Sequence, residues 1–255
     1  MKIYICIKHV PDSAANIAIL GDASIDENVA FLMNPYDEHG VAEAVKLKKQ
    51  FPDSEIIAVC LGKKDAEKTI RSAMAMGADR GILIETAQVP DSMTAARTLK
   101  AAIAQDGTPD IIFTGKESID SEGMQTMFRL AAGFDFPVAN NVVGLEINGG
   151  RARVTYELGG GSNQVCDMAL PCVIGAGRGL NTPGYPTFPD VVKARKKPVA
   201  FVPMESLAVP PAKGSARIVG LAPLVQNRTP KEIKGTPAEI AAKIVTILKE
   251  EAKVI

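Results

Sequence analysis

The sequence has no excess of charge of either sign, since 29 Lys and Arg residues balance 29 Asp and Glu residues over its 255 positions. Surfaces that bind nucleic acid or anionic membranes need a basic excess, so we expect neither partner. No apolar run approaches the roughly 20 residues of a transmembrane helix, which argues against direct membrane insertion. Lys2 enters a predicted strand without a signal-peptide-like apolar region, and we therefore expect a cytoplasmic protein.

Cysteine and histidine are also scarce, and neither is arranged as a metal or redox motif. The two histidines, His9 and His39, lie far apart in the sequence. The four cysteines form no C-x-x-C pair: Cys6, Cys60, Cys166 and Cys172. Zinc sites need closely spaced ligands, and disulfides are rare in a reducing compartment. We therefore predict buried free thiols and no metal site.

The first half of the chain alternates apolar strand patterns with amphipathic helix patterns. The expected strands cover residues 2–8, 55–61, 81–85 and 110–114, and helices are expected at 37–50, at 65–76 and after Asp91. This rhythm is typical of a Rossmann-like α/β fold, in which helices cover both faces of a parallel sheet. If the strand order is 3-2-1-4, it reverses between the first and fourth strands, where such sheets bind ligands. His9, residues 34–37, Leu61 and the loop after Gly115 would then share one rim.

The loop from Gly115 to Thr126 is the strongest candidate for a ligand site. It is polar, contains two glycines, and joins a predicted strand to a helix that is expected to place Met124, Phe128 and Ala131 on one side. Outward backbone N–H groups and the helix dipole favour anions at such a place. The loop matches neither the dinucleotide fingerprint nor the P-loop, so an ordinary connecting loop is the alternative.

Other local patterns indicate hairpins, caps and an appended arm. Asp37 is expected to cap the helix at 37–50, and residues 16–31 are compatible with a small hairpin. Asn148-Gly-Gly150 favours a β-hairpin between strands at 142–147 and 151–157. Residues 199–235 are rich in proline and predict an extended arm, and the capping box that begins at Thr236 starts a final amphipathic helix with Ile240, Ile244, Ile247 and Leu248 on one face.

Several of these segments together resemble the β subunit of electron transfer flavoproteins, including the FixA-type proteins. The matching motifs are residues 7–12, 34–38, 42–48, 73–80 and 187–197, with Gly115, Lys116, Asp120, Gln125 and Thr126. The resemblance implies an adenine-nucleotide-α-hydrolase-like fold and an electron carrier without catalytic residues. It also implies a heterodimer with an α subunit that holds most of a redox-active FAD. Electrons would pass from a flavoprotein dehydrogenase, such as an acyl-CoA dehydrogenase, to a quinone-linked oxidoreductase.

The resemblance further implies a structural AMP in this subunit. Its site would comprise Cys6, Asn34, Pro35, Tyr36, Asp37, Leu61, Gly115, Lys116, Ser118, Ile119, Asp120, Ser121, Gly123, Gln125 and Thr126. Ser121, Gln125 and Thr126 are expected to serve phosphate oxygens, while Asn34 and the main chain near Cys6 would meet the adenine. Met127 stands where many members have glycine, which bears on the phosphate geometry.

Two other functions remain open at this point. An electron-bifurcating relative would carry a second FAD in place of AMP, but Tyr36 in the Asn-Pro-Tyr-Asp turn resembles the ordinary branch. A stand-alone nucleotide-binding stress protein would not need the arm or the final helix.

The domain organisation that we expect has three parts. Residues 1–180 form the nucleotide-binding domain with its hairpin, residues 181–198 form a partner-recognition loop with a short basic helix, and residues 199–255 form an arm and helix that pack on the α subunit. Within the recognition loop, Phe188 is the expected anchor for the dehydrogenase, supported by Tyr185, Lys193 and Arg195.

Overall fold

The structure is a computed structural model that describes every residue except 89, 211–217, 224–229 and 231. The chain divides into two compact units, Met1–Val219 and Gly220–Ile255. The larger unit contains the sheet and the candidate site, and the smaller one contains the C-terminal helix.

One sheet organises the larger unit, and its described strands run in the order β11-β10-β9-β12-β8-β1-β6-β7-β13. The parallel strands are β1 (Lys2–Ile7), β6 (Glu55–Gly62), β7 (Arg80–Glu85), β8 (Ile111–Gly115), β9 (Val138–Asn148), β12 (Cys172–Ala176) and β13 (Val199–Pro203). The segment β7-β6-β1-β8 is the predicted 3-2-1-4 order, which is confirmed. The order of the chain therefore reverses between β1 and β8.

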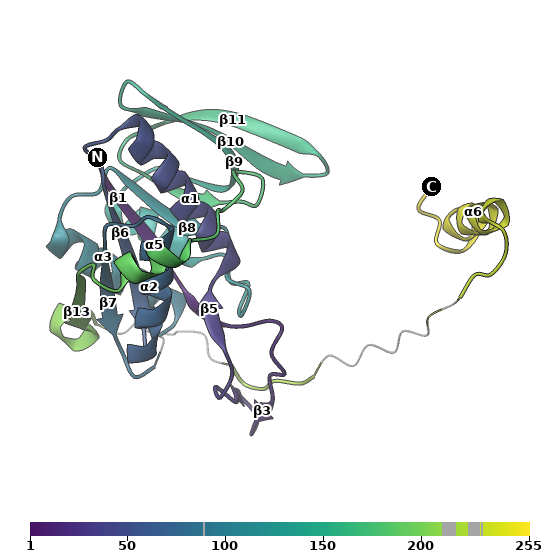
Figure 1. Cartoon of the computed structure of the whole chain (residues 1–255), viewed down its shortest axis with the longest axis horizontal. Helices are drawn as coiled ribbons and strands as arrows, with labels where there is room; N and C mark the ends of the chain where they lie inside the picture. Colours follow the sequence, from purple (N-terminus) through teal and green to yellow (C-terminus); the bar gives the residue numbers. More distant parts are fainter. Residues whose placement is uncertain (89, 211–217, 224–229, 231) are drawn as a thin grey trace. The chain divides into compact units, whose positions relative to one another are not determined.

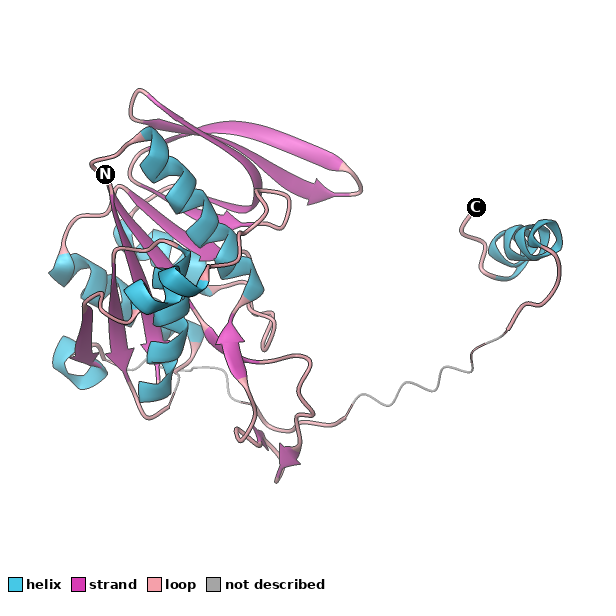
Figure 2. Cartoon of the chain, viewed as in Figure 1, coloured by secondary structure: helices cyan, strands magenta, loops and turns pink. Residues whose placement is uncertain are grey.

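Helices cover both faces of the sheet, as expected for a Rossmann-like fold (Figures 1 and 2). Alternation along β1 sends Ile3 and Ile5 to one face and Tyr4 and Cys6 to the other. The first face packs against α1 (Pro35–Gln50), α2 (Glu67–Met76) and α5 (Phe188–Ala194), and the second against α3 (Ser92–Asp106) and α4 (Thr126–Phe134). Two separate apolar cores thus fix the strand ends on which the candidate site is built.

Local capping explains where two of these helices begin and end. The Asp91 carboxylate accepts hydrogen bonds from the Met93 and Thr94 N–H groups at 2.9 and 3.3 Å, which confirms it as the cap of α3. Helix α2, preceded by the single turn η1 (Lys64–Ala66), ends at Gly77 with φ +135°. The predicted cap of α1 is wrong, because Asn34 occupies the N-cap position and Asp37 lies buried in the first turn.

The face of α4 also differs from the prediction. Met124 precedes the helix, and both it and Phe128 are more than 40% exposed, at 44% and 43%. Ala131 is buried as predicted, but it shares the buried face with Met127 and Leu130. The prediction was wrong because it placed the helical period about one residue too late, at Phe128 in place of Met127.

The hairpin predictions are confirmed. Strand β9 continues into β10 (Arg151–Gly159) through a two-residue turn in which Gly149 and Gly150 have φ of +54° and +77°, values that favour glycine. Strand β11 (Ser162–Ala169) extends this antiparallel ribbon. Residues 16–31 contain the small hairpin of β3 (Ile19–Leu20) and β4 (Ser24–Ile25), and β2 (His9–Pro11) pairs with β5 (Phe31–Met33).

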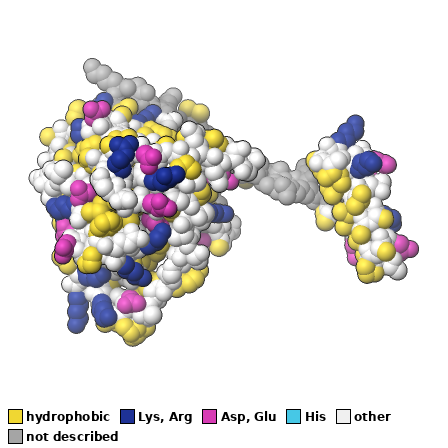
Figure 3. Space-filling model, turned by 90° about the horizontal axis from the view of Figure 1, so that it is seen from above, with side chains coloured by type: hydrophobic (Ala, Val, Ile, Leu, Met, Phe, Trp, Pro, Cys, Tyr) yellow, Lys and Arg dark blue, Asp and Glu magenta, His cyan; other side chains and the backbone are white. Residues whose placement is uncertain are grey.

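The predicted extended arm is wrong at its beginning, because Val199–Pro203 joins the sheet as β13 beside β7 and the turn η2 (Met204–Leu207) follows. Part of the remaining arm lies outside the described residues. The smaller unit contains α6 (Pro237–Thr246), whose predicted capping box is confirmed, and the π-helical turn η3 (Ile247–Glu251). Helix α6 has no buried residue, and apolar side chains are visible on this unit in Figure 3.

The described residues show the state of the cysteines and whether any helix could span a membrane. All four cysteines are free thiols; Cys6, Cys60 and Cys172 are buried, whereas Cys166 is only half-buried. None of the helices in the described ranges is long and apolar enough to span a bilayer. The described residues also contain no group of three or more His, Cys, Asp or Glu side chains suited to a metal ion.

Candidate functional site

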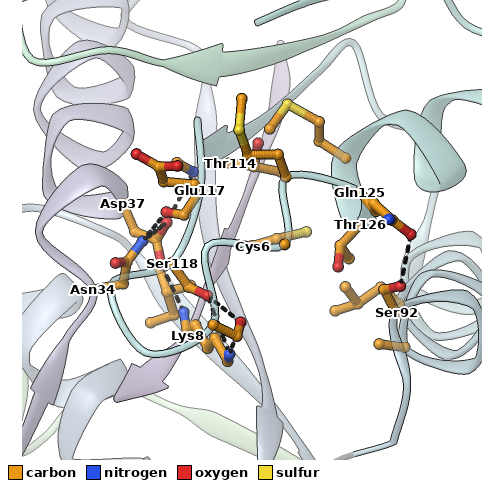
Figure 4. A pocket seen from close by; sticks show the side chains of 18 of the residues that line it. Cys6, Lys8, Asn34, Asp37, Ser92, Thr114, Glu117, Ser118, Gln125 and Thr126 are labelled. Carbon is orange, nitrogen blue, oxygen red and sulfur yellow. Dashed lines mark hydrogen bonds between the residues drawn. The ribbon is translucent and has the colours of Figure 1, made fainter. Parts of the chain in front are cut away.

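A cavity of about 210 Å³ opens at the carboxyl ends of β1 and β8, where the strand order reverses (Figure 4). Parallel sheets place their ligands at such a reversal, because the flanking loops diverge there and leave a crevice. Eleven of the predicted site residues line this cavity: Cys6, Asn34, Asp37, Leu61, Gly115, Lys116, Ser118, Ser121, Gly123, Gln125 and Thr126. Three of the four segments expected at one rim therefore contribute to one site; the fourth, His9, is not part of the lining, and Cys6, Ile7 and Lys8 represent the end of β1 instead.

Four predicted residues do not line the cavity but support it from behind. Pro35 occupies the first turn of α1, and the Ile119 N–H donates to the Asn34 side chain at 3.1 Å. Asp120 forms an ion pair with Lys8 at 2.7 Å. Two cations contact the Tyr36 ring, with Lys116 Nζ at 5.0 Å and Arg178 Cζ at 5.3 Å from its centroid. These contacts hold the loops that form the walls.

Asp37 ties three of the site segments together. Its carboxylate accepts hydrogen bonds from the Lys8 N–H at 2.7 Å, the Gly115 N–H at 2.8 Å and the Asn34 side-chain amide at 2.9 Å. The side chain is buried, and burial raises its pKa to about 7 although the three hydrogen bonds and the charge of Lys8 lower it. The ends of β1 and β8 are therefore both fastened to the first turn of α1.

Gly115 is required by the closeness of this packing. A Cβ atom at this position would lie 2.4 Å from the Asp37 carboxylate and 2.7 Å from the Tyr36 Cβ. Only glycine allows the backbone of β8 to approach α1 this closely. The turn that begins the polar loop is thus set by packing, and the loop is directed over the cavity.

Asn34 holds the same loop from the other side. Its amide group donates to the Glu117 carbonyl at 2.8 Å as well as to Asp37, and its side-chain oxygen accepts from Ile119. Both amide hydrogens are engaged within the protein. Asn34 is therefore placed to shape the loop, whereas a direct contact with a base, as expected from the sequence, would have to use its remaining acceptor capacity.

Lys8 is the main site residue that the sequence interpretation missed. Its ammonium donates to Ser118 Oγ at 3.2 Å, Asp120 Oδ1 at 2.7 Å and Ser121 Oγ at 3.3 Å. Figure 4 shows Lys8 beside Ser118. It thus places a positive charge beside the two serines in the cavity wall. The other missed lining residues are Ile7, Pro90, Ser92, Ala95, Leu99, Thr114, Glu117, Met124 and Met127.

The opposite wall is formed where α3 and α4 begin. Ser92 of α3 faces Gln125 across the cavity mouth, with 3.5 Å between the hydroxyl and the amide oxygen, and Arg129 of α4 donates to the same hydroxyl. The first N–H groups of α4 have no acceptor within the helix, and its dipole adds partial positive charge at Thr126. This end of the cavity is suited to an anionic group.

The floor of the cavity is apolar except for one hydroxyl. Cys6, Leu61, Leu99 and Met127 line it, and burial raises the pKa of the Cys6 thiol far above its usual range. Thr114 Oγ1 is buried and has no hydrogen-bond partner within the described residues. A ligand with a flat apolar part, an anionic part and a group able to bond Thr114 fits these walls.

Met127 in the first turn of α4 both lines the cavity and packs toward the sheet. It is 3% exposed, and its Sδ lies against β12, only 2.6 Å from where a Cβ of Gly175 would stand. The side chain therefore packs toward the sheet as part of the second core. The methionine side chain that stands here in place of glycine is therefore packed against the sheet.

Comparison with known proteins identifies the family. A family model described as "Electron transfer flavoprotein domain" matches residues 23–207. The chain is similar to "Electron transfer flavoprotein subunit beta" of Syntrophomonas wolfei, with 33% identity over all of this chain and 98% of that protein. The proteins of the same name from Bradyrhizobium diazoefficiens and Bacillus subtilis are 34% and 31% identical, and each alignment covers 100% of both chains. The chain belongs to the electron transfer flavoprotein β-subunit family. Membership of this family places it among flavoproteins of electron transport, in accordance with the predicted electron carrier.

The recognition segment expected from the family resemblance is exposed. Tyr185 and Phe188 are 99% and 81% exposed, so Phe188 does not pack into the described body of the protein. Lys193 and Arg195 are also exposed. The segment is therefore accessible to a partner, and its role remains a proposal.

Proposed function

We propose that this chain is the β subunit of a heterodimeric electron transfer flavoprotein that binds one structural AMP and helps an α subunit to hold FAD. Electrons would pass from flavoprotein dehydrogenases, such as acyl-CoA dehydrogenases, to a quinone-linked oxidoreductase. The observation that carries this proposal is the cavity at the β1–β8 reversal, lined by Cys6, Asn34, Leu61 and the Gly115–Thr126 loop. The full-length similarity to proteins named as β subunits supports the partnership.

The walls of the cavity suit the two ends of AMP. The phosphate would lie near the start of α4, where Gln125 and Thr126 meet the helix dipole, with Ser118 and Ser121 nearby. The adenine would lie against the apolar floor, within reach of Thr114 Oγ1. AMP carries no redox group, so its contribution would be to join the loops and stabilise the fold. Electron transfer would depend on the FAD shared with the α subunit.

The two alternatives are less well supported. An electron-bifurcating subunit would carry a second FAD here, but the turn that begins α1 has Tyr36, which resembles the AMP-binding branch and contacts Lys116 and Arg178. A stand-alone stress-type protein is disfavoured because the similarity to named subunits extends over the whole chain, the C-terminal unit included. The free thiols favour a reducing compartment, and we retain the cytoplasm as the proposed location.

The nucleotide content of the purified complex tests this function. The chain is co-expressed with its α subunit, the complex is denatured, and the released nucleotides are separated and quantified. We expect one AMP and one FAD per heterodimer. Two FAD molecules would support the bifurcating alternative, and one FAD without any adenine nucleotide beyond it would contradict the AMP site.

The proposed docking role of the recognition segment has its own test. Prolines at 186 and 189 restrict the backbone beside Phe188, which lowers the entropy lost on binding. Removing an exposed aromatic anchor typically costs about 2 kcal/mol of binding free energy or more. Phe188→Ala should therefore reduce electron transfer from the dehydrogenase at least about tenfold at low concentration. Melting temperature and flavin content should stay near those of the unaltered protein.

A further inference from the structure

The recognition segment is anchored to the body by an exchange of hydrogen bonds between α2 and α5. Arg71 of α2 donates from Nη1 to the carbonyls of Ala194 and Lys197, at 2.9 and 2.6 Å, where α5 ends. Lys197 donates in return to the carbonyls of Met74 and Ala78, at 2.9 and 2.6 Å, where α2 ends. A cation from α2 thus meets the carbonyls at and after the end of α5, and a cation from the residues after α5 meets those at and after the end of α2, where the helix dipole is negative.

Both cations are held in place for this exchange. The Glu67 carboxylate, one turn before Arg71, accepts from its Nε and Nη2 at 3.0 and 2.8 Å and so orients the guanidinium. Lys197 is only partly exposed, and desolvation lowers its pKa. Between the two cations, Ala194 is 1% exposed and packs into the first core. The junction is therefore specific in geometry, and it is more than a chance surface ion pair.

The other end of the segment is also fastened. The Asn181 side-chain amide donates to the His39 carbonyl at 3.0 Å and to Glu43 Oε2 at 2.9 Å, both on α1. The Glu43 side chain is fully buried and also accepts from Lys46 at 2.8 Å. Between Asn181 and Ala194 the segment carries the exposed anchor side chains, and both of its ends are fastened to the body.

We propose that Arg71 and Lys197 are positioning residues, which fix α5 so that Phe188 is presented to the dehydrogenase in a single orientation. This inference rests on the proposed docking function of Phe188. An anchor held in its bound orientation loses less entropy on binding than an anchor on a loose helix. Neither cation needs to touch the partner, because each acts through the carbonyls at the end of the neighbouring helix.

A matched pair of lysine substitutions tests the proposal in the assembled α–β complex. Lys197→Met removes the exchange, and Lys196→Met removes the same charge from an exposed neighbour that makes neither of these bonds in the described structure. An acyl-CoA dehydrogenase is first reduced by its acyl-CoA substrate. The assay then measures how fast this reduced dehydrogenase reduces the flavin of the α–β complex. For Lys197→Met we expect KM for the dehydrogenase to rise about fivefold with kcat unchanged, the effect of re-ordering one or two side chains on docking.

Salt distinguishes positioning from charge steering. Any rise in KM for Lys196→Met should disappear at high ionic strength, since exposed charges are screened. The larger rise for Lys197→Met should persist, because it reflects orientation. Equal effects of the two substitutions at every salt concentration would overturn the proposal.

A double substitution separates this inference from the function on which it rests. If Lys197 acts through Phe188, adding Lys197→Met to Phe188→Ala should change KM less than about twofold, because the anchor is already absent. Independent, multiplicative effects would overturn the positioning role while leaving the docking role intact. No effect of Phe188→Ala alone would instead overturn the docking function itself.

A second variant covers the outcome in which Lys197→Met prevents assembly of the complex. Arg71→Met removes the other half of the exchange, and Arg97→Met, an exposed arginine on α3 at the opposite face of the sheet, is its control. For Arg71→Met we expect the rise in KM predicted for Lys197→Met, with normal flavin content. For Arg97→Met we expect no rise. Identical KM values for the Arg71 and Arg97 variants would contradict the proposal.

Discussion

At the scale of single residues, Asp37 and Gly115 determine the geometry of the cavity. Asp37 is buried and accepts three hydrogen bonds, two of them from the backbone at the ends of β1 and β8. Gly115 leaves room for this carboxylate, which a Cβ would meet at 2.4 Å. The contact between the end of β8 and the start of α1 thus depends on the Asp37 carboxylate and on the lack of a side chain at Gly115.

The raised pKa of Asp37, about 7, predicts a dependence of stability on pH. An unfolded Asp loses its proton near pH 4, whereas the folded state retains it up to about pH 7. Over this interval the folded state binds the extra proton, so the stability that Asp37 contributes falls as pH rises. Asp37→Asn should flatten that part of the melting temperature profile measured between pH 5 and pH 7.5. It should also lower the melting temperature overall, since an amide N–H would face a backbone N–H donor; an unchanged slope would contradict the raised pKa.

Two glycines of one loop give a matched test of the packing argument. Gly115→Ala should destabilise the protein by about 2 kcal/mol, the usual cost of overpacking, and should reduce bound AMP. Gly123→Ala should change stability by less than about 0.5 kcal/mol, because no atom lies within 4 Å of the Cβ it would introduce. Melting curves and nucleotide content measure both effects. Equal losses for the two variants would mean that the close approach at Gly115 is not what makes glycine necessary.

At the scale of elements, the polar loop between β8 and α4 is held closed by Lys8. The ammonium joins Ser118, Asp120 and Ser121, although Lys8 lies more than 100 residues earlier, 110 before Ser118. Within this loop Glu122 and Met124 adopt positive φ, at +47° and +51°. Such backbone is uncommon outside glycine, and it persists only where the surroundings determine it.

Removing this contact should therefore weaken nucleotide binding. Lys8→Met is expected to raise the Kd for AMP about tenfold, the order of one hydrogen bond to a charged group. Lys63→Met is the control, because the Lys63 ammonium pairs with Glu27, and neither residue lines the cavity. Calorimetric titration of the nucleotide-stripped complex with AMP measures both constants. The same Kd for Lys8→Met as for the control would show that the loop keeps its shape without Lys8.

The sequence predicted those elements whose signal is local. Strand–helix alternation was enough for the order β7-β6-β1-β8, since right-handed crossovers leave few other arrangements. The prediction failed for β13 because Val199–Pro203 is bounded by prolines and becomes a strand only through pairing with β7. It failed for α4 because a polar loop hides where the helical period begins.

The candidate site was predictable where its residues carry a local sequence signal. The residues that depend on contacts between distant segments were not. The residues of the Gly115–Thr126 loop could be named because turn chemistry and family motifs both mark them. Lys8 could not, since a lysine at the end of a strand is usually a solvent-facing residue and its partners depend on the pairing of β1 with β8. Asp37 was assigned to a cap because local patterns do not reveal that an acidic side chain will be buried.

At the scale of the whole molecule, the chain combines a body that contains the cavity with a second compact unit at the C-terminus. The body, Met1–Val219, contains both apolar cores and the cavity. In the C-terminal unit, α6 has Ile244 43% exposed and Val245 53% exposed, and none of its residues is buried. An amphipathic helix gains most of its stability from packing its apolar face, so this helix fits a surface that a partner covers.

We expect folding to depend on the body and assembly with the α subunit to depend on the C-terminal unit. A chain that ends at residue 219 should keep the fold and the AMP site, because the contacts that build them lie within the body. It should fail to co-purify with the α subunit, whereas the full chain expressed alone should aggregate or lack flavin because the apolar face of α6 would lack the partner proposed to cover it.

A point substitution tests whether a partner covers α6 without removing any part of the chain. Ile244→Lys places a charge on the exposed apolar face of α6, and it should reduce the yield of the heterodimer at least about tenfold if a partner buries that face. Lys243→Ala, on the neighbouring polar position, should leave the yield unchanged and serves as the control. Size-exclusion chromatography of the co-expressed subunits measures assembly, and circular dichroism confirms that the body is folded. Assembly of the Ile244 variant at the level of the control would show that α6 is not covered by the α subunit, and the partner surface would then have to be sought on the body.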